Sequence, residues 1–425
     1  FMWVGVDMGV SKITLFEARN RFVNVVLAKF DLECIHEAPE DIAALDASTG
    51  ELTLRYSGRD SDGAHNYNVD VITPDVELTL QKLVEEGYLN TEYYTKAEET
   101  ELRDRIRALR EENPEEDIIV VGTGLRAEVF LARDINSIRI VGTSGNDRYS
   151  LKKLNGRVDS IIFDGHDGDD FIEMISDANT VGVLESMTVI GGAGDDVFNI
   201  DTGMLGLGKS YRFEGGAGND QVDIKGTNTL YDGVTIYGGD GDDIIMTGDG
   251  DDHVFGEAGF DVIATYGGND YIEGGDETLA WFTGADGEQH LTPIYQADGT
   301  PFARYNQAGL PVDALGNEIE LTKDNSMFRN QFGDYIHAGT GDNTVYGGSG
   351  NDEIQVGGVD ANGNPVAQGS NYLYGGTGDD IINAGTGSVN VDAGAGDDSV
   401  IWQYAPLAAG ASLIMLGGDG NDVID

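Results

Sequence analysis

The sequence contains a single cysteine, Cys34, among its 425 residues. An intramolecular disulfide framework is therefore excluded, and a chain that folds outside the cell would need another staple. No run of about 18 apolar residues is present, which excludes a membrane-spanning helix. Basic residues are also scarce, since 25 Lys and Arg stand against 76 Asp and Glu, giving a formal net charge of -51. Nucleic acid is thus not expected as a partner, because phosphate binding needs clustered lysines and arginines.

Motifs that would indicate an enzyme are missing as well. The sequence has no G-x-S-x-G elbow and no H-E-x-x-H zinc helix, and its six histidines are scattered. Paired carboxylates are frequent, but ion ligation explains them. We therefore expect a chain without catalytic activity of its own.

Two glycine-rich stretches resemble nucleotide-binding motifs. Val4–Ile13 resembles the first phosphate motif of sugar kinases and their actin-like relatives, but no further phosphate or adenosine motif follows, so we favour a β-hairpin there. Asp117–Ala127 fits a strand followed by G-x-G-x-x-A, the dinucleotide fingerprint. The residues after it, Glu128–Leu131, alternate like a strand rather than a helix. We therefore favour Gly122–Gly124 as the turn of a degenerate first coil.

Glycine and aspartate are abundant instead, and in residues 238–276 they recur every nine positions. An acidic residue at the sixth position and an aliphatic residue at the eighth keep their phase through four units: Asp243 with Ile245, Asp252 with Val254, Asp261 with Ile263, and Asp270 with Ile272. A flexible Gly/Asp-rich linker would have no reason to keep the aliphatic residue in phase. The pattern therefore indicates a repeat structure.

Each position of the nonapeptide has a physical role. Glycine permits the φ > 0 conformations of a tight turn, where a Cβ would clash. The sixth-position carboxylate and the turn carbonyls are the oxygen ligands that Ca²⁺ takes in groups of about 6–8. The eighth-position side chain lies on a short strand and points to one face, so stacked coils share a narrow apolar core. Two nonapeptides make one coil, which leaves room for an ion between successive turns on one edge.

The pattern resembles the RTX (repeats-in-toxin, hemolysin-type) nonapeptide G-G-x-G-x-D-x-U-x. The resemblance implies an all-β fold, a right-handed parallel β-roll or β-helix solenoid with calcium-binding turns. It also implies a protein that is secreted and folds outside the cell when Ca²⁺ binds. The large negative charge agrees with this, because bound divalent cations would remove the self-repulsion that opposes compaction.

Similar turns continue from residue 142 at intervals of 18 to 28 residues, with one gap of 55 after residue 274. We predict a continuous calcium ladder along one edge of the solenoid, holding about ten ions, and a patchier opposite edge. The predicted ligand aspartates are Asp147, Asp170, Asp196, Asp220, Asp243, Asp252, Asp261, Asp270, Asp334, Asp352, Asp380, Asp398 and Asp422. The predicted turn glycines are Gly192, Gly194, Gly216, Gly218, Gly239, Gly241, Gly250, Gly348, Gly350, Gly376 and Gly378.

Two further expectations concern individual turns. On the opposite edge, Asp252 and Asp270 are predicted to hold one ion, and Asp342 with Asn343 offers further oxygen atoms. The turn that begins at Gly274 is predicted to lose its sixth-position aspartate, because the register dissolves after Asp276.

We expect five segments along the chain. Residues 1–90 form a small β-rich module, and residues 91–116 form a capping helix with a linker, in which Leu102, Ile106 and Leu109 share one face. Asn90 or Thr91 is expected to cap this helix. Residues 117–276 and 329–425 form two parts of the solenoid. Between them lies an insertion at 277–328 with six aromatic residues, which we expect to form a small core of its own.

The expected function is a calcium-binding structural or adhesive segment of a giant extracellular bacterial protein, such as an adhesin, a surface layer or a matrix filament. The alternative is the calcium-triggered folding and secretion module of an RTX toxin or exoenzyme, which would show more uniform nonapeptides. Expected partners are calcium ions, other copies or segments of the same protein, and cell-surface glycans. Because the last residues stop at the end of a repeat, we expect the chain to be a piece of a longer protein.

Overall fold

The structure, a computed structural model, describes residues 42–55, 65–86, 88–89, 95–123, 126–154, 156–177, 182–225, 231–275, 333–357, 369–385, 387–402 and 411–425. Outside these ranges it describes six short strands, which are β1 (Gly5–Val6), β2 (Ile13–Thr14), β21 (Trp281–Thr283), β22 (Gln289–Leu291), β23 (Tyr295–Gln296) and β24 (Ser326–Met327). They pair antiparallel as β1 with β2, β21 with β22, and β23 with β24.

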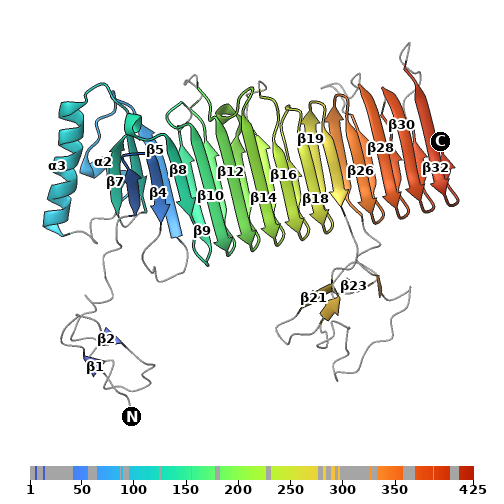
Figure 1. The fold of residues 1–425 in the computed structure, drawn as a ribbon, viewed down its shortest axis with the longest axis horizontal. Helices are drawn as coiled ribbons and strands as arrows, with labels where there is room; N and C mark the ends of the chain where they lie inside the picture. The colour runs from blue at the N-terminus through green and yellow to red at the C-terminus, as the bar shows by residue number, and fades with distance from the viewer. Residues whose placement is uncertain are drawn as a thin grey trace.

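Two long sheets make up a rod-shaped molecule (Figure 1). Sheet 1 contains, in spatial order, β3 (Ala43–Asp46), β4 (Glu51–Arg55), β8 (Ser137–Val141), β10 (Ser160–Asp167), β12 (Ser186–Ala193), β14 (Ser210–Ala217), β16 (Thr235–Asp240), β18 (His253–Ala258), β20 (Tyr271–Gly275), β26 (Thr344–Ser349), β28 (Ser370–Thr377), β30 (Ser388–Ala395) and β32 (Leu413–Asp419). Sheet 2 contains β7 (Ala127–Leu131), β6 (Ile118–Gly122), β5 (His65–Ile72), β9 (Asp147–Lys152), β11 (Phe171–Ile175), β13 (Val197–Asp201), β15 (Gln221–Lys225), β17 (Ile244–Met246), β19 (Val262–Gly267), β25 (Tyr335–Thr340), β27 (Glu353–Val356), β29 (Ile381–Asn383), β31 (Ser399–Ile401) and β33 (Val423–Ile424).

From β8 onward the solenoid strands alternate between the two sheets, and neighbours within each sheet pair in parallel. Phe163 of β10 lies beside Val189 of β12, for example, and Ile172 of β11 lies beside Phe198 of β13. One strand from each sheet forms a coil, and successive coils stack along the rod. The predicted parallel β-roll is therefore confirmed.

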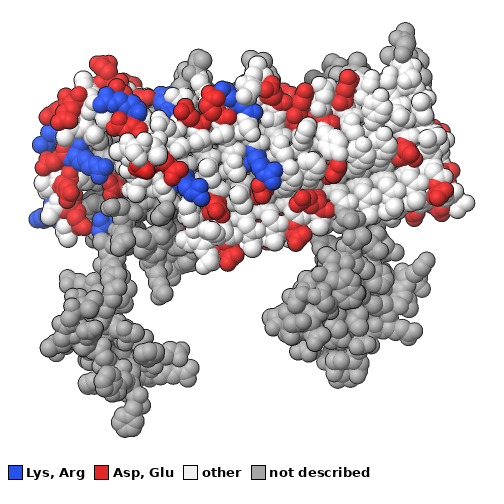
Figure 2. All heavy atoms as spheres, in the orientation of Figure 1, with Lys and Arg blue, Asp and Glu red and all other residues white. Residues whose placement is uncertain are grey.

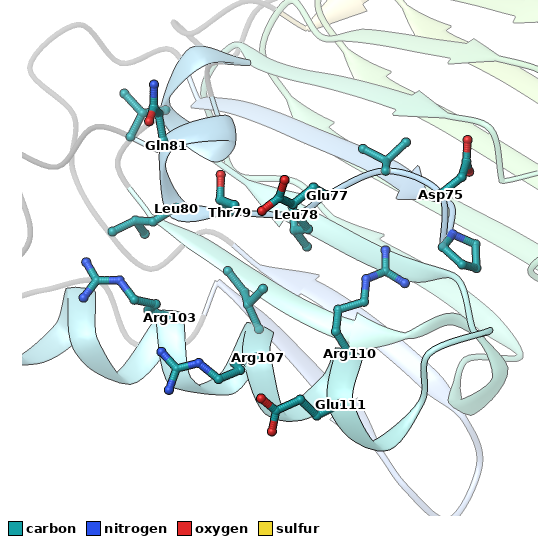
Figure 3. Close-up of a pocket in the computed structure, with 14 residues that line it drawn as sticks. Asp75, Glu77, Leu78, Thr79, Leu80, Gln81, Arg103, Arg107, Arg110 and Glu111 are labelled. Carbon is teal, nitrogen blue, oxygen red and sulfur yellow. The ribbon is translucent and has the colours of Figure 1, made fainter.

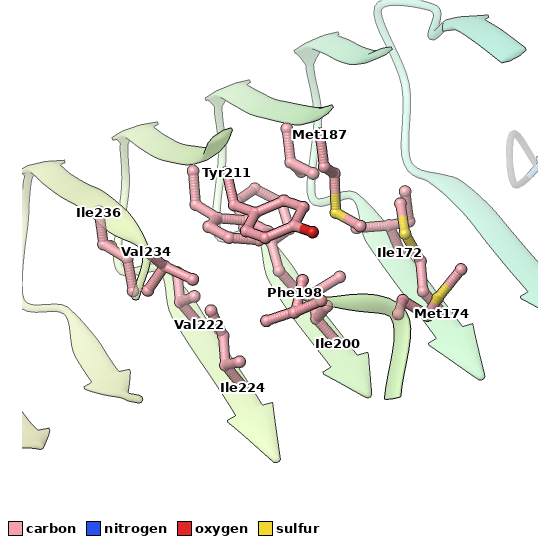
Figure 4. Close-up of a cluster of buried hydrophobic side chains, with 14 of the residues drawn as sticks. Ile172, Met174, Met187, Phe198, Ile200, Tyr211, Val222, Ile224, Val234 and Ile236 are labelled. Carbon is pink, nitrogen blue, oxygen red and sulfur yellow. The ribbon is translucent and has the colours of Figure 1, made fainter. Parts of the chain in front are cut away.

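The core is a narrow column between the two sheets. Strand residues alternate between buried and partly exposed, as in the burial of Phe198 and Ile200 beside the half-exposed Val197 and Asn199. Figure 4 shows Phe198 and Val222 from sheet 2 packed against sheet 1 side chains such as Tyr211. Tyr211 satisfies its buried hydroxyl by donating to the carbonyl of Leu184 at 2.8 Å. The eighth-position aliphatic residues thus build the shared core that their spacing predicts.

The first coil differs from the predicted segment boundaries. Strands β4 and β5 pair in parallel with β8 and β9, so residues 51–55 and 65–72 belong to the solenoid rather than to a separate module at 1–90. Strands β6 and β7 form an antiparallel hairpin, with the Thr123 amide donating to the Arg126 carbonyl, and not the turn of a first coil. The prediction failed because β4 and β5 carry the coil's apolar alternation without the glycine-rich turn that marks later coils.

A helical cap covers this end of the rod. Helix α3 (Lys96–Glu112) begins after Thr95, whose side chain and backbone form a capping box with Glu98, so it starts five residues later than predicted. Leu102 and Ile106 are buried as expected, against Ile118 and other residues of β5 to β7. A second, unpredicted helix, α2 (Leu80–Glu85), completes the cap, and short 3₁₀ turns occur at Ala132–Asp134 and Thr202–Met204.

Helix α3 is tied to the segment before α2 by Arg110. Its guanidinium donates to the carbonyl oxygens of Ile72 and Thr73 at 3.2 and 3.0 Å, and to that of Glu116 at 2.7 Å. Between the helix and residues 74–81 lies an open cavity of about 920 Å³ (Figure 3). No helix among the described residues is long and apolar enough to cross a membrane.

Removing one side chain from the core column should weaken the whole stack. We expect Phe198→Ala to lower the free energy of unfolding by about 3–5 kcal/mol, because it leaves a cavity in a closely packed column. Val197→Ala, on the half-exposed face of the same strand, is the control and should cost under about 1 kcal/mol. Urea denaturation of both variants at saturating calcium tests this, and equal losses would contradict it.

Candidate calcium-binding turns

The glycine-rich turns that lead from sheet 1 to sheet 2 lie in line along one edge of the rod, here called the first edge. Each begins near the end of a sheet 1 strand and ends at a buried aspartate in the sixth position. Eleven predicted aspartates occupy this edge: Asp147, Asp170, Asp196, Asp220, Asp243, Asp261, Asp334, Asp352, Asp380, Asp398 and Asp422. All of them are at most 2% exposed except Asp422, in the last described turn, which is partly exposed.

Hydrogen bonds join these aspartates into one ladder. The backbone amide of Asp170 donates to Asp196 Oδ1 at 2.7 Å, and the amide of Asp196 donates to Asp220 Oδ1 at 2.7 Å. The same bond links every successive pair from Asp147 to Asp422, at 2.7 to 3.1 Å. Each carboxylate therefore uses one oxygen atom to hold the turn of the preceding coil.

The second carboxylate oxygen is left for another partner. Oδ2 is buried without a hydrogen bond from any described residue in Asp170, Asp196, Asp220, Asp243, Asp261, Asp352, Asp380 and Asp398. Burying a charged oxygen atom without a partner is costly, so a cation is the fitting complement.

Main-chain oxygen atoms converge on the same places. A Cβ added to Gly191 would collide with Asp196 Oδ2 and would lie 2.6 Å from the carbonyl oxygen of Gly215 in the next coil. Among the described residues, no three acidic, histidine or cysteine side chains converge on one point. Turn carbonyls are the oxygen atoms that lie closest to these carboxylates, and a mixture of carboxylate and carbonyl oxygens suits Ca²⁺.

The predicted glycines make this close approach possible. Gly192 has φ +120°, and a Cβ there would collide with the carbonyl oxygen of His166 in the preceding coil. Nine other predicted glycines share a positive φ: Gly194, Gly216, Gly218, Gly239, Gly241, Gly348, Gly350, Gly376 and Gly378. Gly250 does not, and is required instead by proximity, because a Cβ there would lie 2.6 Å from the Cα of Gly233.

The second edge, where turns lead from sheet 2 back to sheet 1, carries a shorter ladder. The amide of Asp252 donates to Asp270 Oδ1, that of Asp270 to Asn343 Oδ1, and that of Asn343 to Asn371 Oδ1, each at 3.0 Å. Oδ2 of Asp252 and of Asp270 is again buried without a hydrogen bond from a described residue. The two predicted aspartates are therefore brought together as adjacent rungs, and the ladder continues through neutral amides.

Fifth-position residues form a further ladder that the sequence analysis missed. The amide of Asp195 donates to Asp169 Oδ1 at 3.1 Å, and that of Asn219 donates to Asp195 Oδ1 at 2.8 Å. The pattern recurs at Asp379, Asp397 and Asn421, and these side chains are exposed. The signal was present in the sequence, because asparagine or aspartate precedes most sixth-position aspartates.

Burial raises the pKa of eight sixth-position carboxyls on the first edge, and neighbouring acids raise it further: Asp170, Asp196, Asp220, Asp243, Asp261, Asp352, Asp380 and Asp398. The pKa of Asp196 is raised to about 7, that of Asp220 to about 6, and those of Asp243 and Asp261 to about 8, with hydrogen bonds from backbone amides opposing the shift. On the second edge, burial raises the pKa of Asp252 to about 8. Without a cation, carboxyls whose pKa is about 8, such as those of Asp243 and Asp261, would be mostly protonated at neutral pH, whereas that of Asp220 would be mostly ionised.

These observations define a β-solenoid with carboxylate-lined and carbonyl-lined turns. A family model described as the RTX calcium-binding nonapeptide repeat matches four segments of the chain, at residues 234–254, 246–277, 330–360 and 367–401. These segments are thus RTX repeats, and calcium is the cation that such repeats bind. Neither the curated proteins nor the solved structures gave a match.

A substitution at a sixth-position aspartate can separate the role of Oδ1, which accepts the ladder hydrogen bond, from that of Oδ2, which is left for a cation. We expect Asp243→Asn to keep the hydrogen bond from the amide of Asp220, because Asn343 accepts the equivalent bond on the second edge. It should nevertheless lose about one or two calcium ions, since the ligand charge falls. Native mass spectrometry in calcium counts the ions. The control is Asp240→Asn, at an exposed position of the same turn, which should change nothing.

Calcium affinity should fall on acidification. The pKa of these carboxyls lies above its unfolded value, so the metal-free fold is most stable below about pH 4 and loses stability as the pH rises through about 6 to 8. Calcium must displace the retained protons, so its apparent affinity should drop about tenfold per pH unit for each proton displaced. Calorimetric titrations at pH 8 and pH 5.5 test this, and equal affinities would contradict it.

Proposed function

We propose that this chain is a calcium-binding structural or adhesive segment of a large extracellular bacterial protein, without catalytic activity, which folds on export when calcium fills its turns. The observation that carries the proposal is the row of buried carboxylate oxygens that accept no hydrogen bond from a described residue, such as Oδ2 of Asp196, Asp220 and Asp243. In a chain with net charge -51, ionising them without a cation would oppose stacking of the coils. Proteins with RTX repeats are typically secreted by bacteria, where extracellular calcium is available.

Because folding depends on calcium, the local calcium concentration determines whether the chain folds inside or outside the cell. Extracellular calcium modules commonly bind at about 10⁻⁴–10⁻³ M, far above cytosolic calcium levels. The chain would therefore stay extended in the cytosol and coil after export. The same behaviour would serve the alternative role, the folding and secretion module of an RTX toxin or exoenzyme.

The outer face of sheet 1 favours the structural or adhesive role. Aromatic side chains stack from coil to coil along it, with ring centroids 4.9 Å apart for Tyr237 and Phe255 and 4.6 Å apart for Tyr346 and Tyr374. Tyr346 and Tyr372 are 36% and 48% exposed. Figure 2 shows that few charged side chains interrupt this face over β16 to β28, so another copy or a surface glycan could approach without electrostatic repulsion.

Circular dichroism tests the calcium-driven folding. At a pH above the raised pKa values of the turn carboxyls, we expect a strong β signal in millimolar calcium and its loss in EGTA, because the ionised turns would repel one another without the ion. Equal β content in both conditions would end the proposal.

Association through sheet 1 is tested separately at saturating calcium. The double variant Tyr346→Ala with Tyr372→Ala should reduce self-association or binding to cell-surface polysaccharide several-fold, measured by sedimentation and by binding assays. Tyr266→Ala is the matched control, because Tyr266 is 60% exposed but lies on sheet 2. If neither the chain nor its variants self-associate or bind polysaccharide, the result favours the alternative role as a secretion module.

A further inference from the structure

Five consecutive coils, here called the central coils, carry few charges on either outer face of the rod. They are formed by β16 with β17, β18 with β19, β20 with β25, β26 with β27, and β28 with β29. In each of these strands a buried aliphatic residue is flanked by two outward-facing residues, as Ile245 is flanked by Ile244 and Met246. Ten such flanking residues lie on each face, and one on each face is a carboxylate, Glu273 on sheet 1 and Glu353 on sheet 2.

The sheet 1 face of the central coils is a continuous column of aromatic rings. Each coil contributes one ring, and the centroids of successive rings lie 4.9, 5.9, 5.7 and 4.6 Å apart. The rings belong to Tyr237, Phe255, Tyr271, Tyr346 and Tyr374. The Tyr271 hydroxyl donates to the Glu273 carboxylate, so the one charge on this face already has a partner.

The sheet 2 face of the same coils is mainly aliphatic. Pairing between neighbouring strands places Ile244, Val262, Tyr335, Glu353 and Ile381 in one row. Ile244 and Ile381 are each 43% exposed. Branched aliphatic side chains offer a sugar neither a π face nor a hydrogen bond, whereas they bury well against an apolar protein surface. The sheet 2 face therefore suits a protein partner.

We propose that rods of this protein stack face to face, with the aromatic column of sheet 1 in one copy packed on the aliphatic row of sheet 2 in the next copy. Both rows lie on the first-edge side of their sheets, because sheet 1 strands end at that edge and sheet 2 strands begin there. Copies related by simple translation therefore bring the two rows together. Tyr266 lies at the other end of β19, beside the second edge and outside the contact.

The side chains that meet in this arrangement are complementary. Tyr237 lies opposite Ile244 of the next copy, and Phe255 lies opposite Val262, since these pairs belong to the same coils. Glu273 lies opposite Tyr335 of the next copy, so it meets no second carboxylate.

A contact of sheet 1 with itself is less favourable. If two antiparallel rods buried the central coils in this way, the middle coil of each would bring two Glu273 carboxylates together, and like charges in a contact repel. Ile244 and Ile381 would also stay exposed. Only the contact between sheet 1 and sheet 2 covers both apolar faces, and it uses two different surfaces of each copy. Such a contact does not close, so it builds rows of rods.

The size of the contact sets its strength. A lengthwise contact covers eleven strands of sheet 1, from β8 to β32. At about 4.8 Å per strand and about 10 Å across the central residues, this is about 500 Å² on each copy, or about 1,000 Å² in total. Stable pairs bury about 1,200 Å² or more. We therefore expect weak association that grows with concentration. The inference rests on the proposed function, because both faces exist only when calcium holds the coils together.

Two variants that each block one face provide the test. Tyr372→Glu places a charge on sheet 1 beside the uncharged Thr344 and Asn390, and Ile244→Glu places one on sheet 2 beside Gln221 and Val262. At saturating calcium, sedimentation velocity up to about 500 μM should show growing assemblies of the unmodified chain. Each variant alone should associate at least about tenfold more weakly, because the contact would bury an unpaired charge.

Mixing the two variants distinguishes this arrangement from other modes of association. Each variant keeps the face that the other has lost, so an equimolar mixture should form a one-to-one complex of twice the 45.4 kDa chain mass and grow no further. Leu207→Glu is the control, because Leu207 is 61% exposed in the turn between β13 and β14, away from both faces. It should assemble like the unmodified chain.

Three results would overturn the proposal. A mixture that stays monomeric would exclude contact between sheet 1 and sheet 2. Normal assembly of Ile244→Glu beside a defect in Tyr372→Glu would show that sheet 1 contacts itself. An unmodified chain that stays monomeric throughout, but binds a neutral polysaccharide through Tyr372, would assign the face to a glycan. Circular dichroism of the same samples keeps the proposed function separate, since calcium-dependent β content without stacking refutes only the stacking.

Discussion

The fold depends on one repeated contact, the hydrogen bond from the backbone amide of a sixth-position aspartate to the carboxylate of the aspartate in the next coil. Together with backbone hydrogen bonds between the turns, such as that from the Val197 amide to the Asp170 carbonyl at 2.8 Å, it fixes the distance between coils at the edge. It also orients the carboxylate so that one oxygen is used and the other faces the carbonyl-lined space between turns. A single side-chain type thereby provides both the register of the coils and the negative charge that requires a cation.

This arrangement ties stability to the surroundings of the chain. The core between the sheets is narrow, since from β8 onward most strands bury only one or two apolar side chains, so each coil buries little apolar surface by itself and relies on its neighbours. Along the edges, the buried carboxyls are stable either protonated or beside a cation. We therefore expect the stability of the turns, rather than that of the sheets, to depend on calcium and pH. The cap of α2, α3 and the β6–β7 hairpin covers one end of the rod.

The repeated part of the fold was predictable from the sequence. The eighth-position column, the eleven first-edge aspartates and the turn glycines follow from a nine-residue spacing, and the structure places these residues as predicted. The errors occur where spacing carries no information. Strands β4 and β5 complete a coil without a recognisable turn, and Thr95 rather than Asn90 caps α3 because Glu98 stands three residues later. The aromatic core predicted for the insertion lies outside the described residues.

The structure corrects one part of the predicted register, because Asp334 Oδ2 lies beside Gly274 and the turn that begins there does not lose its sixth-position aspartate. This pairing could not be found by counting residues. A register read along the chain ends at Asp276, and the partner of Gly274 appears only when three-dimensional stacking brings Asp334 back beside it. The fifth-position ladder was missed for a different reason. Its Asn and Asp residues are visible in the sequence, but their role is not, because the hydrogen bonds they accept come from backbone amides of the next coil.

The unequal lengths of the coils have a consequence for how such chains diversify. Ladder partners on the first edge are separated by 18, 23, 24, 26 or 28 residues, and in one case by 73, yet the amide-to-carboxylate bond keeps the same length. Additions to a loop therefore leave the pitch of the stack unchanged. A lineage can accordingly acquire new surface segments at any corner by insertion or recombination, and a protein engineer can graft a foreign domain there, without redesigning the rest of the rod.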